Sequence, residues 1–292
     1  MGKRVGLSIA AILAILLAAG VPYVWSQGYF QSNRSDAATP TTSPSGRTPK
    51  HAARGAAPAP PALPPAFVHP APVSIDSPGF WSWTVLDRRT GETAGSPNAA
   101  VANRTASMIK AWLASDYLRR AAERNATPSA ATMQQLTIMI RNSDNAAASA
   151  MWEANGRFAS ITRLVTICGL TDSRAYIDWA STLVSARDAA RMGACIGDGR
   201  AAGPKWTEWV LNEMRHVSAT GRFGILPALP ADVAPQTAIK NGWVARSDGK
   251  WHINCMAIGT DWVLAVMTVY PVSMGMTHGG DICASITRQL MA

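Results

Sequence analysis

The spacing of apolar residues along the second part of the chain predicts both strands and helices. Residues 80–86 are rich in aromatic and β-branched side chains, which predicts a strand. Thr90 and Gly91 are turn residues, so we expect a second strand to follow them. Residues 105–123 predict an amphipathic helix, because four apolar residues recur there at helical spacing. They are Ile109, Trp112, Leu113 and Tyr117.

Further helices are predicted where apolar periodicity coincides with start and stop signals. Gly169 can close one helix, and Ser185 with Asp188 forms a variant of the capping box that opens another. The predicted helices cover residues 129–141, 146–154, 158–168, 185–196, 204–216 and 280–290.

Three strands are predicted at residues 236–244, 251–259 and 262–270. The turn residues at 247–249 would join the first two as a hairpin. Strands, a block of helices, three strands and a closing helix together predict an α+β fold. Its antiparallel sheet would be formed by the N- and C-terminal segments, with an all-helical subdomain between them. We assign residues 73–292 to this single domain.

The first 72 residues have a different composition. An apolar run of about twenty residues follows Lys3 and Arg4, long enough to cross a bilayer. We interpret residues 1–26 as an uncleaved signal anchor or, alternatively, as a signal peptide cleaved after small residues at 18–20. The run has no cysteine for a lipid anchor. Residues 27–72, rich in Ala, Pro, Ser and Thr, predict a disordered or polyproline-like linker. Both interpretations place the domain outside the cytoplasm.

The formal charge of +9 is unevenly distributed along the chain. Residues 1–72 hold six Lys or Arg and one Asp, for a charge of +5. Residues 73–292 hold the other 21 Lys or Arg and 17 Asp or Glu, for a charge of only +4. The domain has no run of basic residues, so we do not expect nucleic acid as a partner.

Three short motifs succeed one another in the domain. They are the Ser107–Lys110 segment (Ser-Met-Ile-Lys), the Ser143–Asn145 segment (Ser-Asp-Asn) and the Lys240–Gly242 segment (Lys-Asn-Gly). Their order and spacing resemble the S-x-x-K, S-D-N and K-T-G set of the penicillin-recognising serine acyl enzymes. The chain is most similar to class A β-lactamases, as an exported variant of actinobacterial type. The resemblance covers nearly all of residues 73–292 and implies the β-lactamase/transpeptidase-like fold.

The first two motifs would supply the acylation chemistry. The resemblance makes Ser107 the nucleophile and Lys110 its base, since a desolvated lysine can have a lowered pKa. Ser143 would relay a proton to the leaving nitrogen, and Asn145 would hold the substrate amide. Taken alone, the first motif could be a surface Ser and Lys on an amphipathic helix, and the second could be a helix N-cap. The cap and the site can coexist if Asp144 does the capping.

The third motif would bind substrate from a strand that lines the cleft. Lys240 would supply positive charge for a carboxylate, and Gly242 would let the substrate backbone approach. Asn241 replaces the family's usual Thr or Ser, and an amide can still donate to a carboxylate. The backbone N–H groups of Ser107 and Trp243 would form the oxyanion hole. Taken alone, the motif could also be an exposed Lys and a bulge on an ordinary strand.

The segment between Gly169 and Ser185 departs from the family. Class A β-lactamases carry a longer loop here, whose Glu activates the water that removes the acyl group. Residues 170–184 contain no Glu, and Asp178, the only nearby carboxylate, is expected to be a turn or cap residue. We therefore expect weak or absent β-lactam turnover. We expect Trp179 and Trp243 near the cleft, and Arg246 either as an added cation or as a solvated hairpin residue.

The four cysteines all lie in the exported domain, where an oxidising compartment favours disulfides. We predict the pairs Cys168–Cys195 and Cys255–Cys283, because each is local in the fold that the element order and the resemblance imply. No metal-binding spacing is present, so we expect neither a metal nor a cofactor.

Two functions are compatible with the sequence. The first is a serine hydrolase or acyltransferase acting on β-lactams or peptidoglycan stem peptides through Ser107. The second is a catalytically inactive envelope module of the same fold that binds peptidoglycan or a protein partner. In either case we expect a monomer held at the membrane by its N-terminal segment.

Overall fold

The computed structural model of the protein describes residues 64–291. The predicted signal segment and residues 27–63 of the predicted linker lie outside this part. Residues 64–72 belong to the predicted linker, yet Ala66 and Val68 are buried and the His69 N–H donates to the Leu290 carbonyl at 3.0 Å. The packed chain therefore begins before residue 73. Within the described residues, no helix has the length and apolar character needed to cross a membrane.

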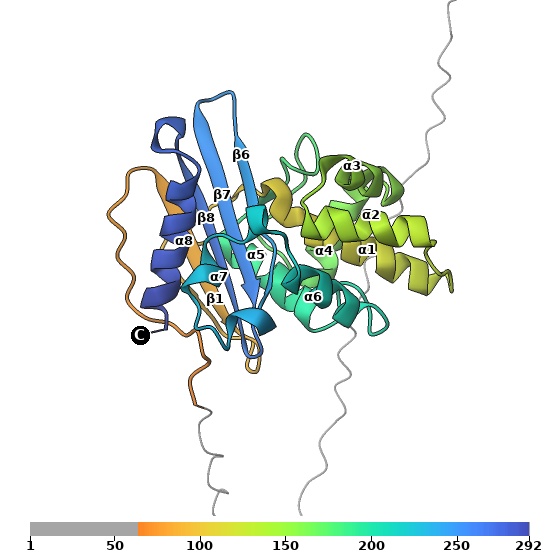
Figure 1. Ribbon diagram of the computed structural model, residues 1–292, viewed down its shortest axis with the longest axis horizontal. Helices are drawn as coiled ribbons and strands as arrows, with labels where there is room; N and C mark the ends of the chain where they lie inside the picture. The colour runs from red at the N-terminus through yellow and green to blue at the C-terminus, as the bar shows by residue number, and fades with distance from the viewer. Residues whose placement is uncertain (1–63, 292) are drawn as a thin grey trace, which may run out of the picture. The chain divides into compact units, whose positions relative to one another are not determined.

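A six-stranded antiparallel sheet is formed within the described residues (Figure 1). Its order is β2-β1-β8-β7-β5, with β6 also paired to β7, so the first and last segments share one sheet as predicted. The strands are β1 (Phe80–Asp87), β2 (Thr93–Gly95), β5 (Ala238–Ile239), β6 (Gly242–Ala245), β7 (Lys250–Ile258) and β8 (Trp262–Pro271). Asn103–Arg104 (β3) and Leu183–Val184 (β4) form a separate small ladder.

The single strand predicted at 236–244 is wrong, because the chain divides it into β5 and β6. The division falls at Lys240 and Asn241, whose side chains are both buried. A regular strand would place these neighbours on opposite faces of the sheet. The hairpin between β6 and β7 is present as predicted, closed by a bond from the Arg246 N–H to the Lys250 carbonyl at 2.9 Å.

The predicted helices are present, with ends that differ by at most three residues when the 3₁₀ turn before α1 is included. Ser107 lies in that single turn, η1 (Ala106–Ile109), which runs directly into α1. The helices are α1 (Lys110–Glu123), α2 (Ala130–Arg141), α3 (Asn145–Ala154), α4 (Phe158–Cys168), α5 (Ala186–Gly197), α6 (Thr207–Arg215), α7 (Ile225–Ala228) and α8 (Thr277–Gln289). The sequence patterns do not predict the short α7.

Helix α5 connects the two parts of the domain. It packs on β1, β7 and β8, and it also contacts α1, α4 and α6. Helix α8 covers the other face of the sheet, and helices α1 to α4 and α6 gather on the far side of α5 (Figure 1). The three motifs lie on η1 and the start of α1, at the start of α3, and at the junction of β5 and β6, so they meet where the helical part adjoins the sheet.

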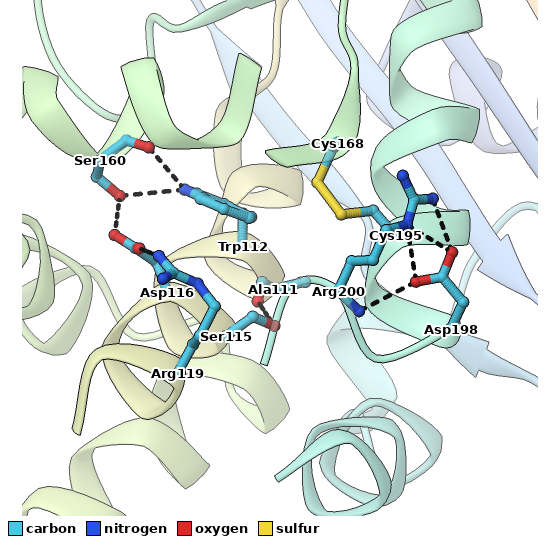
Figure 2. The surroundings of a disulfide bond; sticks show 10 residues. All are labelled: Ala111, Trp112, Ser115, Asp116, Arg119, Ser160, Cys168, Cys195, Asp198 and Arg200. Atoms are coloured by element: carbon cyan, nitrogen blue, oxygen red, sulfur yellow. Dashed lines mark hydrogen bonds and ion pairs between the residues drawn. A yellow bond between two sulfur atoms is a disulfide. The ribbon is translucent and has the colours of Figure 1, made fainter. Parts of the chain in front are cut away.

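Both predicted disulfides are confirmed. Cys168–Cys195 joins α4 to α5, and Cys255–Cys283 joins β7 to α8. Figure 2 shows the first bond beside a buried polar network on α1. In that network Asp116, fully buried, accepts hydrogen bonds from Arg119 and Ser160 at 2.6 and 2.8 Å. This network fixes α1, which carries Lys110 at its start.

Candidate active site

Ser107 follows a backbone position that side chains rarely adopt. Ala106 has a φ of 47°, in the left-handed region, which costs a non-glycine residue of the order of 1–3 kcal/mol. The Ala106 N–H donates to the Ala180 carbonyl, and the Thr105 N–H donates to Thr182, each at 3.0 Å. The 170–184 segment therefore holds the strained turn in place. Ser107 itself is 9 % exposed at the head of α1.

Lys110 is buried one turn after Ser107. Its Nζ donates to the Ser143 carbonyl at 2.5 Å and to Asn145 Oδ1 at 2.8 Å. Burial lowers the Lys110 pKa to about 7, and the nearby Asp144 carboxylate opposes this shift in part. Near neutral pH a large share of Lys110 amines is therefore uncharged and able to accept a proton.

Ser143 lies between two lysines. Its Oγ is 3.4 Å from Lys110 Nζ and 3.1 Å from Lys240 Nζ. Lys240 is fully buried, and burial together with the charge of Lys110 lowers its pKa well below the usual value. Ser143 has a φ of 58°, again in the left-handed region. Because its Oγ lies within hydrogen-bonding distance of both amines, the Ser143 hydroxyl can exchange protons with either.

Asp144 caps the helix while its neighbours face the lysines. Its carboxylate accepts the Ala147 N–H at 2.7 Å, at the start of α3. Ser143 and Asn145 contact Lys110 on either side of it. The cap and the polar site, predicted as alternatives that could coexist, are both present.

Strand β6 approaches the Ser107 turn most closely at Gly242. A Cβ atom there would lie 2.3 Å from the Thr105 carbonyl and 2.9 Å from the Ser107 nitrogen. Any larger residue would push β6 away from η1. This contact brings together the two segments that carry the predicted oxyanion donors, the N–H groups of Ser107 and Trp243.

Asn241 is directed away from the role predicted for it. Its side-chain amide donates to the Gly221 carbonyl at 2.9 Å and to the Phe223 carbonyl at 2.8 Å. Only 1 % of Asn241 is exposed. Both amide hydrogens are thus used to hold the 221–223 segment, and neither is free for a substrate carboxylate.

The 170–184 segment presents an aromatic ring to Lys110. The centroid of the Trp179 ring lies 4.8 Å from Lys110 Nζ, and the indole N–H donates to Ser149 Oγ at 3.3 Å. The Asp178 carboxylate instead accepts the Ser181 N–H at 2.6 Å, as a turn residue does. Trp243 contacts Phe223 edge to face at 5.6 Å, with Lys240 Nζ 5.8 Å from its ring. Both tryptophans thus lie beside the motif lysines, as expected.

A second buried polar group was missed by sequence reasoning. His252 and Asn254 lie on β7, and the Asn254 amide donates to the Arg104 carbonyl at 2.8 Å. Burial, and next the charge of Arg104, lowers the His252 pKa to about 4. Arg246 donates to the Ala180 carbonyl at 3.3 Å, so it anchors the 170–184 segment and is not a solvated hairpin residue. For His252 and Asn254, the available signal in the sequence was the presence of two polar residues inside an apolar strand.

Comparison with known proteins places these observations in context. No family model matches the chain. Relatives from Mycobacterium bovis and Mycobacterium tuberculosis, which carry the provisional name lipoprotein LppW, are 29% identical over 202 residues. The match covers 65% of this chain, and it spans only 63% of the relatives' own length.

Solved structures resemble the described chain more completely in fold than in sequence. A β-lactamase from Chitinophaga pinensis superposes with a TM-score of 0.62 at 16% identity, over 73% of this chain and 93% of its own. A β-lactamase from Desulfarculus baarsii superposes with a TM-score of 0.59 at 14% identity, over 72% of this chain and 90% of its own. A variant of the last common ancestor of the class A β-lactamases of Gram-negative bacteria gives 0.57 at 18% identity, over 73% and 91%. The chain has the β-lactamase fold.

Proposed function

We propose that the protein is a serine acyl enzyme of the β-lactamase and penicillin-binding type, acting on β-lactam or peptidoglycan-peptide amides through Ser107. The observation that carries the proposal is the position of the Ser143 hydroxyl, within 3.4 Å of Lys110 Nζ and 3.1 Å of Lys240 Nζ. Two buried lysines around one hydroxyl are costly for stability, since each amine is desolvated. Proton transfer is a function that would justify this cost.

In the proposed reaction, Ser107 Oγ attacks the substrate carbonyl carbon and an O–C bond forms. The hydroxyl proton passes to the neutral amine of Lys110. The N–H groups of Ser107 and Trp243 stabilise the oxyanion. The C–N bond then breaks while Ser143 gives its proton to the leaving nitrogen and regains one from Lys110. The product is an acyl ester on Ser107.

We further propose that the protein acts outside the cytoplasm. Two disulfides within the described residues support this location, because such bonds persist in oxidising compartments. The provisional name of the mycobacterial relatives, a lipoprotein, agrees with a place in the cell envelope. Attachment of this chain through residues 1–26 belongs to the same proposal.

Intact-protein mass spectrometry tests the nucleophile. Incubation with a penicillin, or with an activated ester of a small acid, should add one acyl group to the protein. The adduct should be absent in Ser107→Ala. Ser115→Ala is the matched control, because Ser115 is a buried serine on α1, the helix that follows the Ser107 turn, and its hydroxyl donates to the Ala111 carbonyl at 2.8 Å. An adduct that persists in Ser107→Ala would remove Ser107 from its role.

A catalytically inactive envelope module is the second candidate. It is favoured by the engaged amide of Asn241 and by the absence of Glu from the 170–184 segment. This candidate predicts binding to purified peptidoglycan that is equal in the wild type and in Ser107→Ala, with no adduct in either. The acyl-enzyme proposal predicts an adduct in the wild type and none in Ser107→Ala.

A further inference from the structure

The region beside Ser143 and Lys240 determines which leaving group the site accepts. In the proposed function, on which this inference rests, Ser143 protonates the leaving group. The leaving group must therefore lie next to the Ser143 hydroxyl, whose neighbour on that side is Lys240 at 3.1 Å. The surroundings of Lys240 and of the adjacent residue, Asn241, decide what chemistry fits there.

Lys240 is poorly suited to pair with a substrate anion. The side chain is fully buried, and its Nζ already donates to Ser143 Oγ and to the Asn241 carbonyl, each at 3.1 Å. Burial, and next the repulsion of Lys110, lowers its pKa well below the usual value and so favours the uncharged amine. An uncharged amine offers a hydrogen bond to a leaving group but no ionic attraction.

Asn241 offers no free hydrogen-bond donor to an anion on the same side of the site. Its amide donates at 2.9 and 2.8 Å to the carbonyls of Gly221 and Phe223. A substrate carboxylate could take these hydrogens only by breaking both bonds. It would thereby leave two backbone carbonyls without partners, which is unfavourable for buried polar groups.

Two aromatic rings lie on the same side of the site, and we call the surface formed by Phe223 and Trp243 the aromatic wall. Phe223 and Trp243 meet edge to face at 5.6 Å, and the Trp243 ring lies 5.8 Å from Lys240 Nζ. Both rings are partly exposed, so they are available to a ligand. Aromatic surface favours an apolar leaving group and gives no compensation for the desolvation of a carboxylate.

Two arginines that lie near Phe223 and Lys240 in the sequence donate to backbone carbonyls. Arg222, next to Phe223, is exposed, and its guanidinium donates to the Arg215 carbonyl at 3.4 Å. Arg246, at the end of the β6 hairpin, donates to the Ala180 carbonyl at 3.3 Å. Both guanidinium groups are thus engaged by backbone carbonyls.

We propose that the site accepts acyl donors whose leaving group is neutral and apolar, and that it discriminates against donors with a carboxylate beside the scissile bond. The substrate class is therefore an ester, thioester or amide without that carboxylate. Penicillins carry one, so they would be slow acylating agents for Ser107.

Two thioesters with the same acyl group test the proposal. Benzoylglycyl mercaptoacetate carries a carboxylate in its leaving group, and benzoylglycyl mercaptoacetamide replaces that carboxylate with a neutral amide of similar size. In both, the C–S bond breaks, the ester to Ser107 forms and a thiol leaves. All four cysteines of the chain are in disulfides, so the released thiol can be titrated without background. We expect the neutral donor to acylate faster by at least about fivefold, which corresponds to about 1 kcal/mol, the lower end of the cost of leaving a buried polar group unpaired.

Variants locate the source of the preference. Phe223→Arg places a cation on the aromatic wall and should raise the ratio of the charged donor's acylation rate to that of the neutral donor. Arg222→Gln, the matched change of an exposed charge at the next residue, should leave the ratio unchanged. Equal rates for the two donors in the wild type, or a faster rate for the charged donor, would overturn the proposal. If the charged donor is faster in the wild type but not in Arg222→Gln, Arg222 is its counter-ion. Failure of both donors to label Ser107 would instead contradict the proposed function itself.

Discussion

The role proposed for Lys110 as a base depends on where the side chain is buried. Its amine has two close acceptors, the Ser143 carbonyl and Asn145 Oδ1, yet desolvation outweighs them and brings the pKa to about 7. A lysine at its ordinary pKa would be protonated at neutral pH and could not accept the Ser107 proton. The chemistry at this residue thus depends on packing.

Acylation of Ser107 should depend on pH through Lys110. Because the Lys110 pKa is lowered to about 7, the reactive neutral amine is lost as pH falls below that value and predominates above it. The acylation rate should decrease by about tenfold per pH unit on the acid side and level off on the alkaline side. Stopped-flow measurement of thiol release across this range provides the test, and a rate independent of pH would contradict it.

Replacement of Lys110 should abolish most of this rate. Lys110→Arg keeps a positive charge that cannot be deprotonated, so acylation should fall by roughly 10²–10⁴. Lys250→Arg, at an exposed lysine of the β6–β7 hairpin, is the control and should acylate normally. A Lys110→Arg protein that acylates at the wild-type rate would assign the base to another group, such as Lys240.

At the scale of elements, the 170–184 segment would determine the fate of the proposed acyl enzyme. It supports the Ser107 turn through Ala180 and Thr182, and it presents Trp179 to Lys110. An indole ring cannot activate water, and Asp178 is engaged by the Ser181 N–H. In the proposed reaction Ser107, Lys110 and Ser143 would carry out acylation, and neither Trp179 nor Asp178 would supply a second base for water.

Turnover of β-lactams should be slow or absent after a first equivalent. A positioned base typically contributes a factor of about 10²–10⁴, and none is available in this segment. With a chromogenic cephalosporin, whose carboxylate should make acylation slow, we expect product to level off at about one equivalent after long incubation. Asp178→Asn should leave the slow phase unchanged. Steady multiple turnover that is lost in Ser107→Ala but kept in Asp178→Asn would refute this expectation and make Lys110 the candidate for activating water.

At the scale of the whole domain, the two disulfides each tie a helix to a neighbouring element. Cys168–Cys195 closes a separation of 27 residues between α4 and α5, and Cys255–Cys283 closes one of 28 between β7 and α8. The two bonds therefore lie in different halves of the fold, one in the helical part and one against the sheet.

Removal of either bond should lower the free energy of unfolding by roughly 2–4 kcal/mol, because each loop restricts the unfolded chain. Denaturant titration of Cys168→Ala with Cys195→Ala, and of Cys255→Ala with Cys283→Ala, measures the two contributions. Non-reducing peptide mapping checks the pairing. Free thiols, crossed pairs or unfolding curves that do not change on reduction would contradict the assignment.

Local sequence patterns are sufficient to predict the long helices, most strands of the sheet and the order of the motifs. Helical periodicity in residues 105–123 and the cap residue Ser185 act locally, so α1 and α5 begin and end close to the predicted residues. The α+β order came from the same patterns, and the disulfides came from that order together with the family resemblance. The strand predicted at 236–244 failed because Lys240 and Asn241 are both buried by contacts with distant segments, which no local period records.

The environment of the site, in contrast, is created by long-range packing. The amide of Asn241 is bound by a segment about twenty residues away, Trp179 meets Lys110 across about seventy residues, and Ser143 meets Lys240 across about a hundred. Burial and charge in that arrangement, and not the residue types alone, give the two lysines their lowered pKa values. These properties could not be read from the sequence, because desolvation and hydrogen-bond competition depend on which groups the packed chain brings together.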